Sequence, residues 1–209
     1  MEYILLLTAC INPDGMPFTC LADVGVRKKQ YIEALNFYLK NTTRKIVFVE
    51  NSGTDISSSF KDFQHRIEFL CFDGNLCFDK RKGKGYGEAL ILEYAMAKSE
   101  FITDDVLIFK LTGRLQLINI NRLIHYMDKL SPSKNFVCVV PPQNNSVDSR
   151  CFVCNKYYLE NIFLKDKFHI DDSVGYYFEH LLFSDLMHLS FLYKSFLLMI
   201  EFHLLQNSQ

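Results

Sequence analysis

Short apolar segments alternate with helix-like segments along the first half of the chain, and this alternation constrains the fold more than any other feature. The apolar runs are Tyr3 to Thr8, Lys45 to Val49, Arg66 to Phe72 and Val106 to Phe109. Tyr31 to Lys40, and the segment from Tyr86 onward, instead carry apolar residues at helical spacing. Strands that alternate with helices predict an α/β fold with a mostly parallel sheet flanked by helices.

The second half is less regular. Asn121 to Lys129 and Gly175 to Leu186 are expected to be helical, and Arg150 to Val153 is expected to be a strand. Phe136 to Val140 is another expected strand, which Pro141 and Pro142 must end. No repeat or linker divides the chain, so residues 1–209 are expected to form a single domain.

Composition excludes several classes of protein. The chain is 49% hydrophobic and 22% charged, which is typical of globular domains rather than disordered or fibrous ones. Its net charge of −1 argues against a nucleic-acid partner, so any anion site must be local. An odd number of cysteines, seven, without a signal-type start predicts a reducing cytoplasm. Cys151 and Cys154 are interpreted as ordinary buried thiols because no second pair has metal spacing.

The C-terminal residues 185–209 form an apolar tail that is expected to be helical. The run from Leu181 to Leu205 is interrupted by charged and histidine residues, so it does not predict a simple membrane span. A helix docked on the core and a helix lying in a membrane interface both fit the pattern.

The carboxyl ends of three predicted strands are expected to form one neighbourhood, because ligands of parallel sheets bind beyond those ends. The segments are Thr8 to Asn12, Glu50 to Gly53 and Lys110 to Arg114. Asn51 and Glu50 are suited either to hydrogen bonds with a nucleobase or ribose or to capping a turn. Asp148 and Arg150 are suited to contacting a substrate or each other.

Two basic motifs predict an anion site in this neighbourhood. Four of the five residues from Lys80 to Lys84 are basic, and Gly83, Gly85 and Gly87 leave the backbone open just before a helix begins. Lys110 and Arg114 add an ammonium and a guanidinium at a strand end. The alternatives are a solvated loop for the glycine turn and an ion pair of Arg114 with Asp104 or Asp105.

Glu179 is the best candidate for a general base. In a helix from Gly175 it shares a stripe with Leu182, Phe183 and Leu186, and apolar surroundings favour a carboxyl that takes a proton near neutral pH. The alternative is a glutamate at a helix start that pairs with a nearby lysine.

The order of these motifs resembles the GT-A-type glycosyltransferases, especially the small bacterial enzymes of capsule and lipopolysaccharide O-antigen synthesis. The resemblance covers roughly residues 1 to 185. It rests on motifs in a matching order: Leu7-Thr-Ala-Cys-Ile-Asn-Pro, Arg27 with Tyr31-Ile-x-Ala-Leu, Val49-Glu-Asn-Ser-Gly, Lys82-Gly-Lys-Gly-Tyr-Gly-Glu-Ala-Leu, and Val106-Leu-Ile-Phe-Lys-Leu-Thr-Gly-Arg. The resemblance implies a GT-A-like, Rossmann-like sheet and transfer of a sugar from a nucleoside-diphosphate donor.

Where most GT-A enzymes carry Asp-x-Asp to hold a divalent metal, this chain has Lys110 and Thr112. The resemblance therefore implies no metal and no other cofactor, with Lys110 and Arg114 neutralising the diphosphate. It implies a catalytic role for Glu179 as the base. The implied donor-binding residues are Thr8, Ala9, Asn12, Glu50, Asn51, Lys84, Gly85, Thr112 and Gly113.

The implied partners are a nucleotide sugar and a glycan acceptor, free or lipid-linked, for a cytoplasmic enzyme that contacts the inner face of the cytoplasmic membrane. A catalytically inactive nucleotide-sugar-binding or scaffolding subunit is the alternative from another class. A nucleotidyltransferase shares the sheet order, but those enzymes carry a glycine- and arginine-rich loop after the first strand, which Thr8-Ala-Cys-Ile-Asn-Pro lacks.

Overall fold

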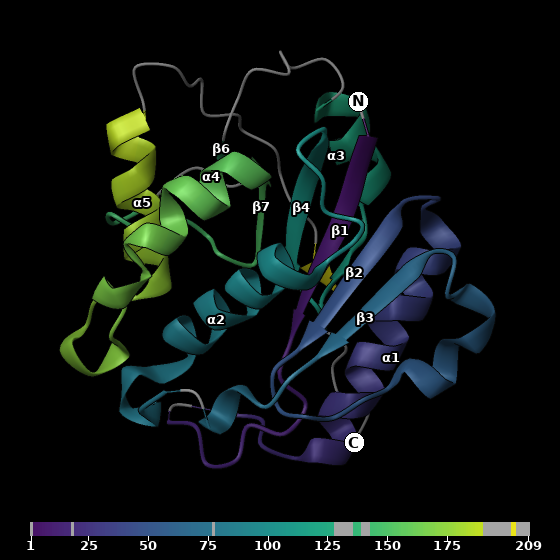
Figure 1. Ribbon diagram of the computed structural model, residues 1–209, viewed down its shortest axis with the longest axis horizontal. Coiled ribbons are helices and arrows are strands. Elements are labelled where there is room, and N and C mark those ends of the chain that lie inside the picture. The colour runs from purple at the N-terminus through teal and green to yellow at the C-terminus, as the bar shows by residue number, and fades with distance from the viewer. Residues whose placement is uncertain are drawn as a thin grey trace.

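A six-stranded sheet forms the centre of the molecule (Figure 1). The computed structural model describes residues 2–17, 19–76, 78–127, 136–138, 143–189 and 202–203. The strand order is β3-β2-β1-β4-β7-β6, with β3, β2, β1 and β4 parallel. The strands are β1 (Glu2–Ala9), β2 (Lys45–Glu50), β3 (Ile67–Cys71), β4 (Val106–Thr112), β6 (Phe136–Cys138) and β7 (Cys151–Asn155). β7 is antiparallel to both of its neighbours.

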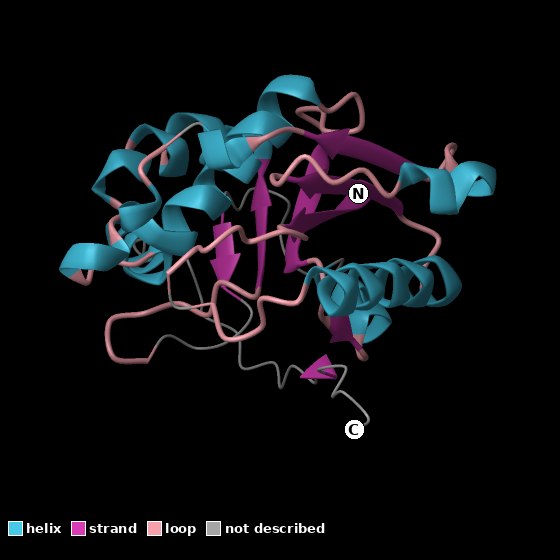
Figure 2. Cartoon of the chain, turned by 90° about the horizontal axis from the view of Figure 1, so that it is seen from below, coloured by secondary structure: helices cyan, strands magenta, loops and turns pink. Residues whose placement is uncertain are grey.

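Helices cover both faces of this sheet (Figure 2). α1 (Val24–Asn41) and α3 (Ile120–Met127) contribute buried residues to one face. α2 (Gly83–Lys98), α4 (Lys156–Asn161) and α5 (Phe178–Leu189) contribute to the other. The chain is therefore a layered α/β domain.

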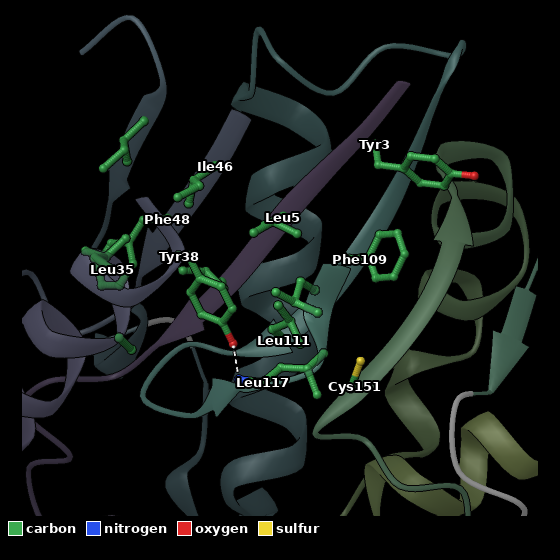
Figure 3. Packing of buried hydrophobic residues seen from close by; sticks show 14 of the residues in the cluster. Tyr3, Leu5, Leu35, Tyr38, Ile46, Phe48, Phe109, Leu111, Leu117 and Cys151 are labelled. Carbon is green, nitrogen blue, oxygen red and sulfur yellow. Dashed lines mark hydrogen bonds between the residues drawn. The ribbon is translucent and has the colours of Figure 1, made fainter. Parts of the chain in front are cut away.

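The central strands are apolar throughout because both of their faces are covered. Along β1, Tyr3, Leu5 and Leu7 belong to the cluster under α1, whereas Ile4 and Leu6 belong to the cluster under α2. Figure 3 shows the first cluster. There, the buried Tyr38 hydroxyl donates to the carbonyl of Leu115 at 2.8 Å and accepts from the amide of Leu117 at 3.1 Å. Burial raises the pKa of Tyr38, so the hydroxyl keeps its proton for that bond.

Short elements connect these layers. They are the 3-10 helices η1 (Ser57–Phe63), η2 (Gly74–Leu76), η3 (Lys80–Lys82), η4 (Phe163–Lys165), η5 (Lys167–His169) and η6 (Asp172–Val174), and a two-stranded sheet of β5 (Gln116–Leu117) and β8 (Phe202–His203). η3 leads directly into α2, and η6 lies against both.

The predicted fold class is confirmed, and several boundaries are corrected. β4 continues to Thr112, so Lys110 lies inside the strand rather than beyond it. α2 begins at Gly83 instead of Tyr86, and α5 begins at Phe178 instead of Gly175.

Parts of the predicted tail lie outside the described residues, as do Pro141 and Pro142. Within 185–209, α5 continues to Leu189, and Phe202–His203 is a strand rather than a helix. Among the described residues, no helix is long and apolar enough to cross a membrane.

Candidate functional site

A cavity of about 310 Å³ lies where β1, β2 and β4 end and α2 begins. Its walls bring together six of the residues predicted to form the site, namely Thr8, Ala9, Asn51, Lys84, Thr112 and Arg114. Thr8 and Thr112 are register partners on the neighbouring strands β1 and β4. The expectation that these strand ends form one neighbourhood is therefore confirmed.

The loop after β1 closes one side of the cavity, and Arg27 holds it in place. From α1, the Arg27 guanidinium donates to the carbonyl of Cys10 at 2.8 Å and to that of Leu21 at 3.0 Å. The hydroxyl of Tyr31, one turn later, accepts from the amide of Cys10 at 3.0 Å. Burial raises the pKa of the Cys10 thiol to about 11, so it remains a thiol, although Arg27 opposes the shift. Arg27 and Tyr31 also line the cavity, and only the family resemblance had singled them out.

Glu50 builds the loops beside the cavity and does not line it. Its carboxylate accepts from the amides of Ile11 at 2.7 Å, Ser52 at 2.8 Å and Thr54 at 2.8 Å, and from the Ser52 hydroxyl. Only 1% of Glu50 is exposed. Asn12 is exposed and also outside the cavity walls, and its amide donates to the Ser52 hydroxyl. Glu50 and Asn12 thus organise loops beside the cavity, and their donor contacts stay a prediction.

Asn51 lines the cavity, but its side-chain oxygen is enclosed by the protein. Its amide nitrogen donates to the carbonyl of Gly87 at 3.4 Å, and its buried Oδ1 atom has no hydrogen-bond partner among the described residues. The buried hydroxyl of Thr19, in the β1–α1 loop, also has no partner in the described part of the chain. Both residues contribute to the walls, although these two oxygen atoms have no surface that a ligand could reach.

Lys110 lies beneath the cavity rather than in its wall. It has no exposed surface, and its ammonium forms an ion pair with Glu88 at 2.5 Å and donates to the carbonyl of Ser149 at 2.6 Å. The rings of Phe152 and Phe178 lie 5.6 and 5.7 Å from it. The structure gives no support to the predicted contact of Lys110 with a diphosphate, because β4 carries the side chain under α2.

Arg114 faces the cavity, and it makes no hydrogen bond or ion pair with any described residue. Its predicted alternative partner Asp104 pairs instead with Lys156 at 3.8 Å. Gly113 turns the chain between Thr112 and Arg114. Its amide donates to the carbonyl of Thr8 at 2.9 Å, and a Cβ atom there would lie 2.8 Å from that oxygen. Gly113 therefore allows the backbone after β4 to pack closely against the end of β1, and it does not line the cavity.

A carboxylate of the chain itself occupies the start of α2, where the sequence predicted a phosphate. Asp172 from η6 accepts from the amide of Gly85 at 3.5 Å. Burial raises the pKa of Asp172, although hydrogen bonds from the backbone of Gly85 and Lys84 oppose the shift. Side chains at Gly83 or Gly85 would crowd this carboxylate. Gly85 does not line the cavity and its donor contact stays a prediction, whereas Lys84 reaches the cavity wall.

Glu179, in the first turn of α5, does not line the cavity. It is joined to the cavity by a chain of contacts: its carboxylate accepts from the Ser149 hydroxyl at 2.5 Å, and the Ser149 carbonyl accepts from Lys110. Nearby, Asp148 and Arg150 pair with each other at 2.6 Å. Burial would raise the pKa of Asp148, but hydrogen bonds and charge from Arg150 lower it below its ordinary value.

The residues at the Asp-x-Asp position do not fit a divalent metal, because Lys110 is a cation and Thr112 offers a single neutral oxygen. Across the described part of the chain, no group of three histidine, cysteine, aspartate or glutamate side chains is arranged to hold a metal ion. Cys151 and Cys154 belong to clusters on opposite faces of the sheet. Their interpretation as buried thiols is confirmed, and burial raises the pKa of Cys151 to about 12.

A second cavity of about 310 Å³ lies beside α5 and shares no wall with the first. Asp166, His169, Tyr176, Leu181 and Ser184 line it. Next to Ser184, burial raises the pKa of Asp185 to about 6, although the Tyr158 hydroxyl donates to its carboxylate at 2.7 Å. No residue predicted from the sequence to be functional lines this second cavity.

Solved structures of glycosyltransferases have a similar fold. The apo form of mouse xyloside xylosyltransferase 1 is 14% identical with a TM-score of 0.54, over 94% of this chain and 85% of that one. The apo form of the glycosyltransferase GlyE from Streptococcus pneumoniae TIGR4 is 10% identical with a TM-score of 0.54, over 94% of this chain and 45% of that one. The fold is GT-A-like. No family model and no curated protein matches the sequence.

Sequence reasoning missed Glu88. It lies on the face of α2 that also carries Lys84, Gly87 and Ile91, and all four line the cavity. The helical spacing of Glu88 from Lys84 was the available signal. The ion pair of Glu88 with Lys110 could not be predicted from the sequence, because the two residues are far apart along the chain.

Proposed function

We propose that this chain is a glycosyltransferase that moves a sugar from a nucleoside-diphosphate donor to a glycan acceptor. One observation carries the proposal: a cavity at the strand ends combines the Arg114 guanidinium, which pairs with no described residue, with the polar side chains of Thr8, Asn51 and Glu88. A guanidinium donates hydrogen bonds and suits a diphosphate, whereas hydroxyl, amide and carboxylate groups suit the base and the hydroxyls of a nucleoside and a sugar. A nucleotide sugar carries both kinds of group. The GT-A-like fold supports the same class of ligand.

In this proposal, each part of the donor has its own residues. Thr8, Ala9 and Asn51 contact the nucleoside, and Arg114 and Lys84 contact the diphosphate. Thr112 completes the wall between them. Preorganised cations stabilise the charge that develops on a leaving diphosphate.

The reaction forms a bond between the acceptor hydroxyl oxygen and the anomeric carbon, while the bond from that carbon to the diphosphate oxygen breaks. Glu179 receives the proton of the acceptor hydroxyl, and the diphosphate leaves with the electron pair. The role of Glu179 requires the acceptor to approach from the side of Ser149 and α5.

We further propose that transfer needs no divalent metal and serves surface polysaccharide synthesis at the cytoplasmic face of the membrane. Metal independence is proposed because Lys110 and Thr112 stand where most GT-A enzymes have the two aspartates of Asp-x-Asp. The role in surface polysaccharide synthesis is proposed because the Lys-Leu-Thr-Gly-Arg motif resembles the motif at this position in capsule and O-antigen enzymes.

The direct test is the variant Arg114→Ala, measured for donor affinity by calorimetry and for donor hydrolysis and transfer by release of nucleoside diphosphate. We expect turnover to fall at least about 100-fold, because the variant loses a preorganised cation at the leaving group. Arg81→Ala is the matched control, since that side chain is 86% exposed and pairs with Asp79. Near wild-type turnover in Arg114→Ala, with the fold intact by circular dichroism, would remove the diphosphate role.

A catalytically inactive nucleotide-sugar-binding subunit is the second candidate, and the place of Glu179 outside the cavity walls favours it. Such a subunit would bind the nucleotide sugar but release no nucleoside diphosphate, with or without acceptors. Donor hydrolysis by the purified protein decides between the two functions.

A further inference from the structure

The Glu88 carboxylate has one oxygen that contacts Thr8 and Lys110 and one that accepts no hydrogen bond from the described residues. Oε1 accepts from the Thr8 hydroxyl at 2.8 Å and pairs with the Lys110 ammonium at 2.5 Å. No described residue donates a hydrogen bond to Oε2, and the side chain lines the cavity with 22% of its surface exposed. The carboxylate is therefore held in one orientation with a free acceptor.

Lys110 is placed to serve Glu88 rather than a ligand. Its ammonium forms an ion pair with Glu88 and donates a hydrogen bond to the Ser149 carbonyl, and aromatic rings flank it. A ligand in the cavity cannot touch a side chain with no exposed surface. The buried ammonium instead cancels the charge of the carboxylate, which would otherwise repel a diphosphate held by Arg114 and Lys84.

The chemistry of the remaining Glu88 oxygen selects its ligand. A carboxylate oxygen only accepts hydrogen bonds, so a phosphate oxygen cannot bind there. A cation is disfavoured because Lys110 already neutralises the carboxylate and Lys84 and Arg114 share the same cavity. A neutral hydroxyl donor fits both conditions.

We infer that Glu88 is a specificity-determining residue, whose carboxylate accepts hydrogen bonds from ring hydroxyls of a nucleotide sugar, with Lys110 as its buried counter-ion. The inference rests on the proposed function and deepens it. The hydroxyls belong either to the transferred sugar or to the ribose, and the test separates these sources.

The test uses the double variant Glu88→Met/Lys110→Met. Removing both charges together avoids leaving a buried ammonium without its partner, and apolar side chains of similar size can replace a buried ion pair. Glu93→Met/Lys167→Met is the matched control, because Glu93 is also on α2 and forms an ion pair with Lys167. Thermal unfolding followed by circular dichroism verifies that all proteins are folded.

Calorimetry gives the affinity of each protein for three probes. The first is the nucleotide sugar that stabilises the wild-type protein most in a panel of UDP-glucose, UDP-galactose, UDP-N-acetylglucosamine and GDP-mannose. The second is its nucleoside diphosphate, and the third is the 2′,3′-dideoxy form of that diphosphate. A hydrogen bond to a charged group contributes enough free energy that losing a hydroxyl contact should weaken binding at least about tenfold.

If the sugar hydroxyls bind Glu88, the variant loses affinity for the nucleotide sugar alone. If a ribose hydroxyl binds Glu88, the variant also loses affinity for the nucleoside diphosphate, and the wild-type protein binds the 2′,3′-dideoxy form as weakly as the variant does. Equal losses for all three probes would show a direct diphosphate contact by Lys110 and overturn the inference, as would no loss at all. A wild-type protein that binds none of the probes would instead overturn the proposed function itself.

Discussion

Lys110 and Arg114 are both basic and four positions apart, yet their environments are opposite. β4 carries Ile108 and Lys110 on the face that α2 covers, so Lys110 is buried and requires the Glu88 carboxylate. Arg114 lies beyond the end of the strand and past Gly113, and it reaches the cavity. The end of a strand thus decides which of two similar side chains meets a ligand.

Glu179 is the residue whose role most needs a measurement. We expect Glu179→Gln to lower turnover by about 100-fold or more, because a general base contributes on that scale. Donor affinity should stay nearly constant, since Glu179 does not line the cavity and glutamine can still accept from the Ser149 hydroxyl. Single-turnover rates and calorimetry measure the two quantities separately.

Glu160→Gln is the control for that experiment, because the Glu160 side chain is 40% exposed and pairs with Lys156 on α4. An unchanged rate in Glu179→Gln would assign Glu179 to holding Ser149 in place. That result would also strengthen the case for a binding subunit without catalysis.

At the scale of elements, the start of α2 shows how a glycine turn can serve the protein's own structure. η6 brings the Asp172 carboxylate to the first amides of the helix, where a negative charge is favourable. Gly83 has a φ of +83°, and its missing side chain leaves the space that Asp172 fills. The glycines that suggested phosphate binding therefore admit a carboxylate from another part of the chain.

This packing predicts that two glycine substitutions will lower the free energy of unfolding by different amounts. Gly83→Ala should lower the free energy of unfolding by about 3 kcal/mol, because it combines a left-handed backbone with an overlap against Asp172. Gly175→Ala should cost only about 1 kcal/mol, since Gly175 has a φ of +79° but no atom within 4 Å of the added Cβ. Urea unfolding of both variants checks the difference. Equal costs would mean that Asp172 does not pack against Gly83 in solution.

Elements that are long, or that are buried on both faces, were predicted well from the sequence, whereas short elements were predicted poorly. β1 and β2 were found because strands covered on both faces are continuous apolar runs. α4, with six residues, and the 3-10 helices around η5 carry too few turns to show a period. The end of β4 was placed too early because Lys110 interrupts the apolar run, and only its partner on α2 makes a buried lysine acceptable there.

For the whole molecule, the cavity exists because the topology brings distant segments to one edge of the sheet. Thr8, Asn51 and Thr112 come from three strand ends, and Lys84 and Glu88 come from the helix that crosses them. This arrangement could be predicted, because ligands of parallel sheets bind beyond the carboxyl ends of the strands. The loop after β1 was not predictable, because its closure depends on Arg27 and Tyr31 reaching backward from α1.

Binding of a donor in that cavity should stabilise the whole domain, and the residues at the Asp-x-Asp position predict that no metal is needed. A nucleotide sugar at 100 times its dissociation constant adds about 2.7 kcal/mol, which corresponds to a rise in Tm of roughly 5–10 °C for a chain of this size. We expect the same rise in excess EDTA, because Arg114 and Lys84 provide the positive charge. Transfer measured in parallel should also persist. A rise in Tm and an activity that both vanish in EDTA and return only with Mn²⁺ or Mg²⁺ would refute metal independence while leaving the donor site in place.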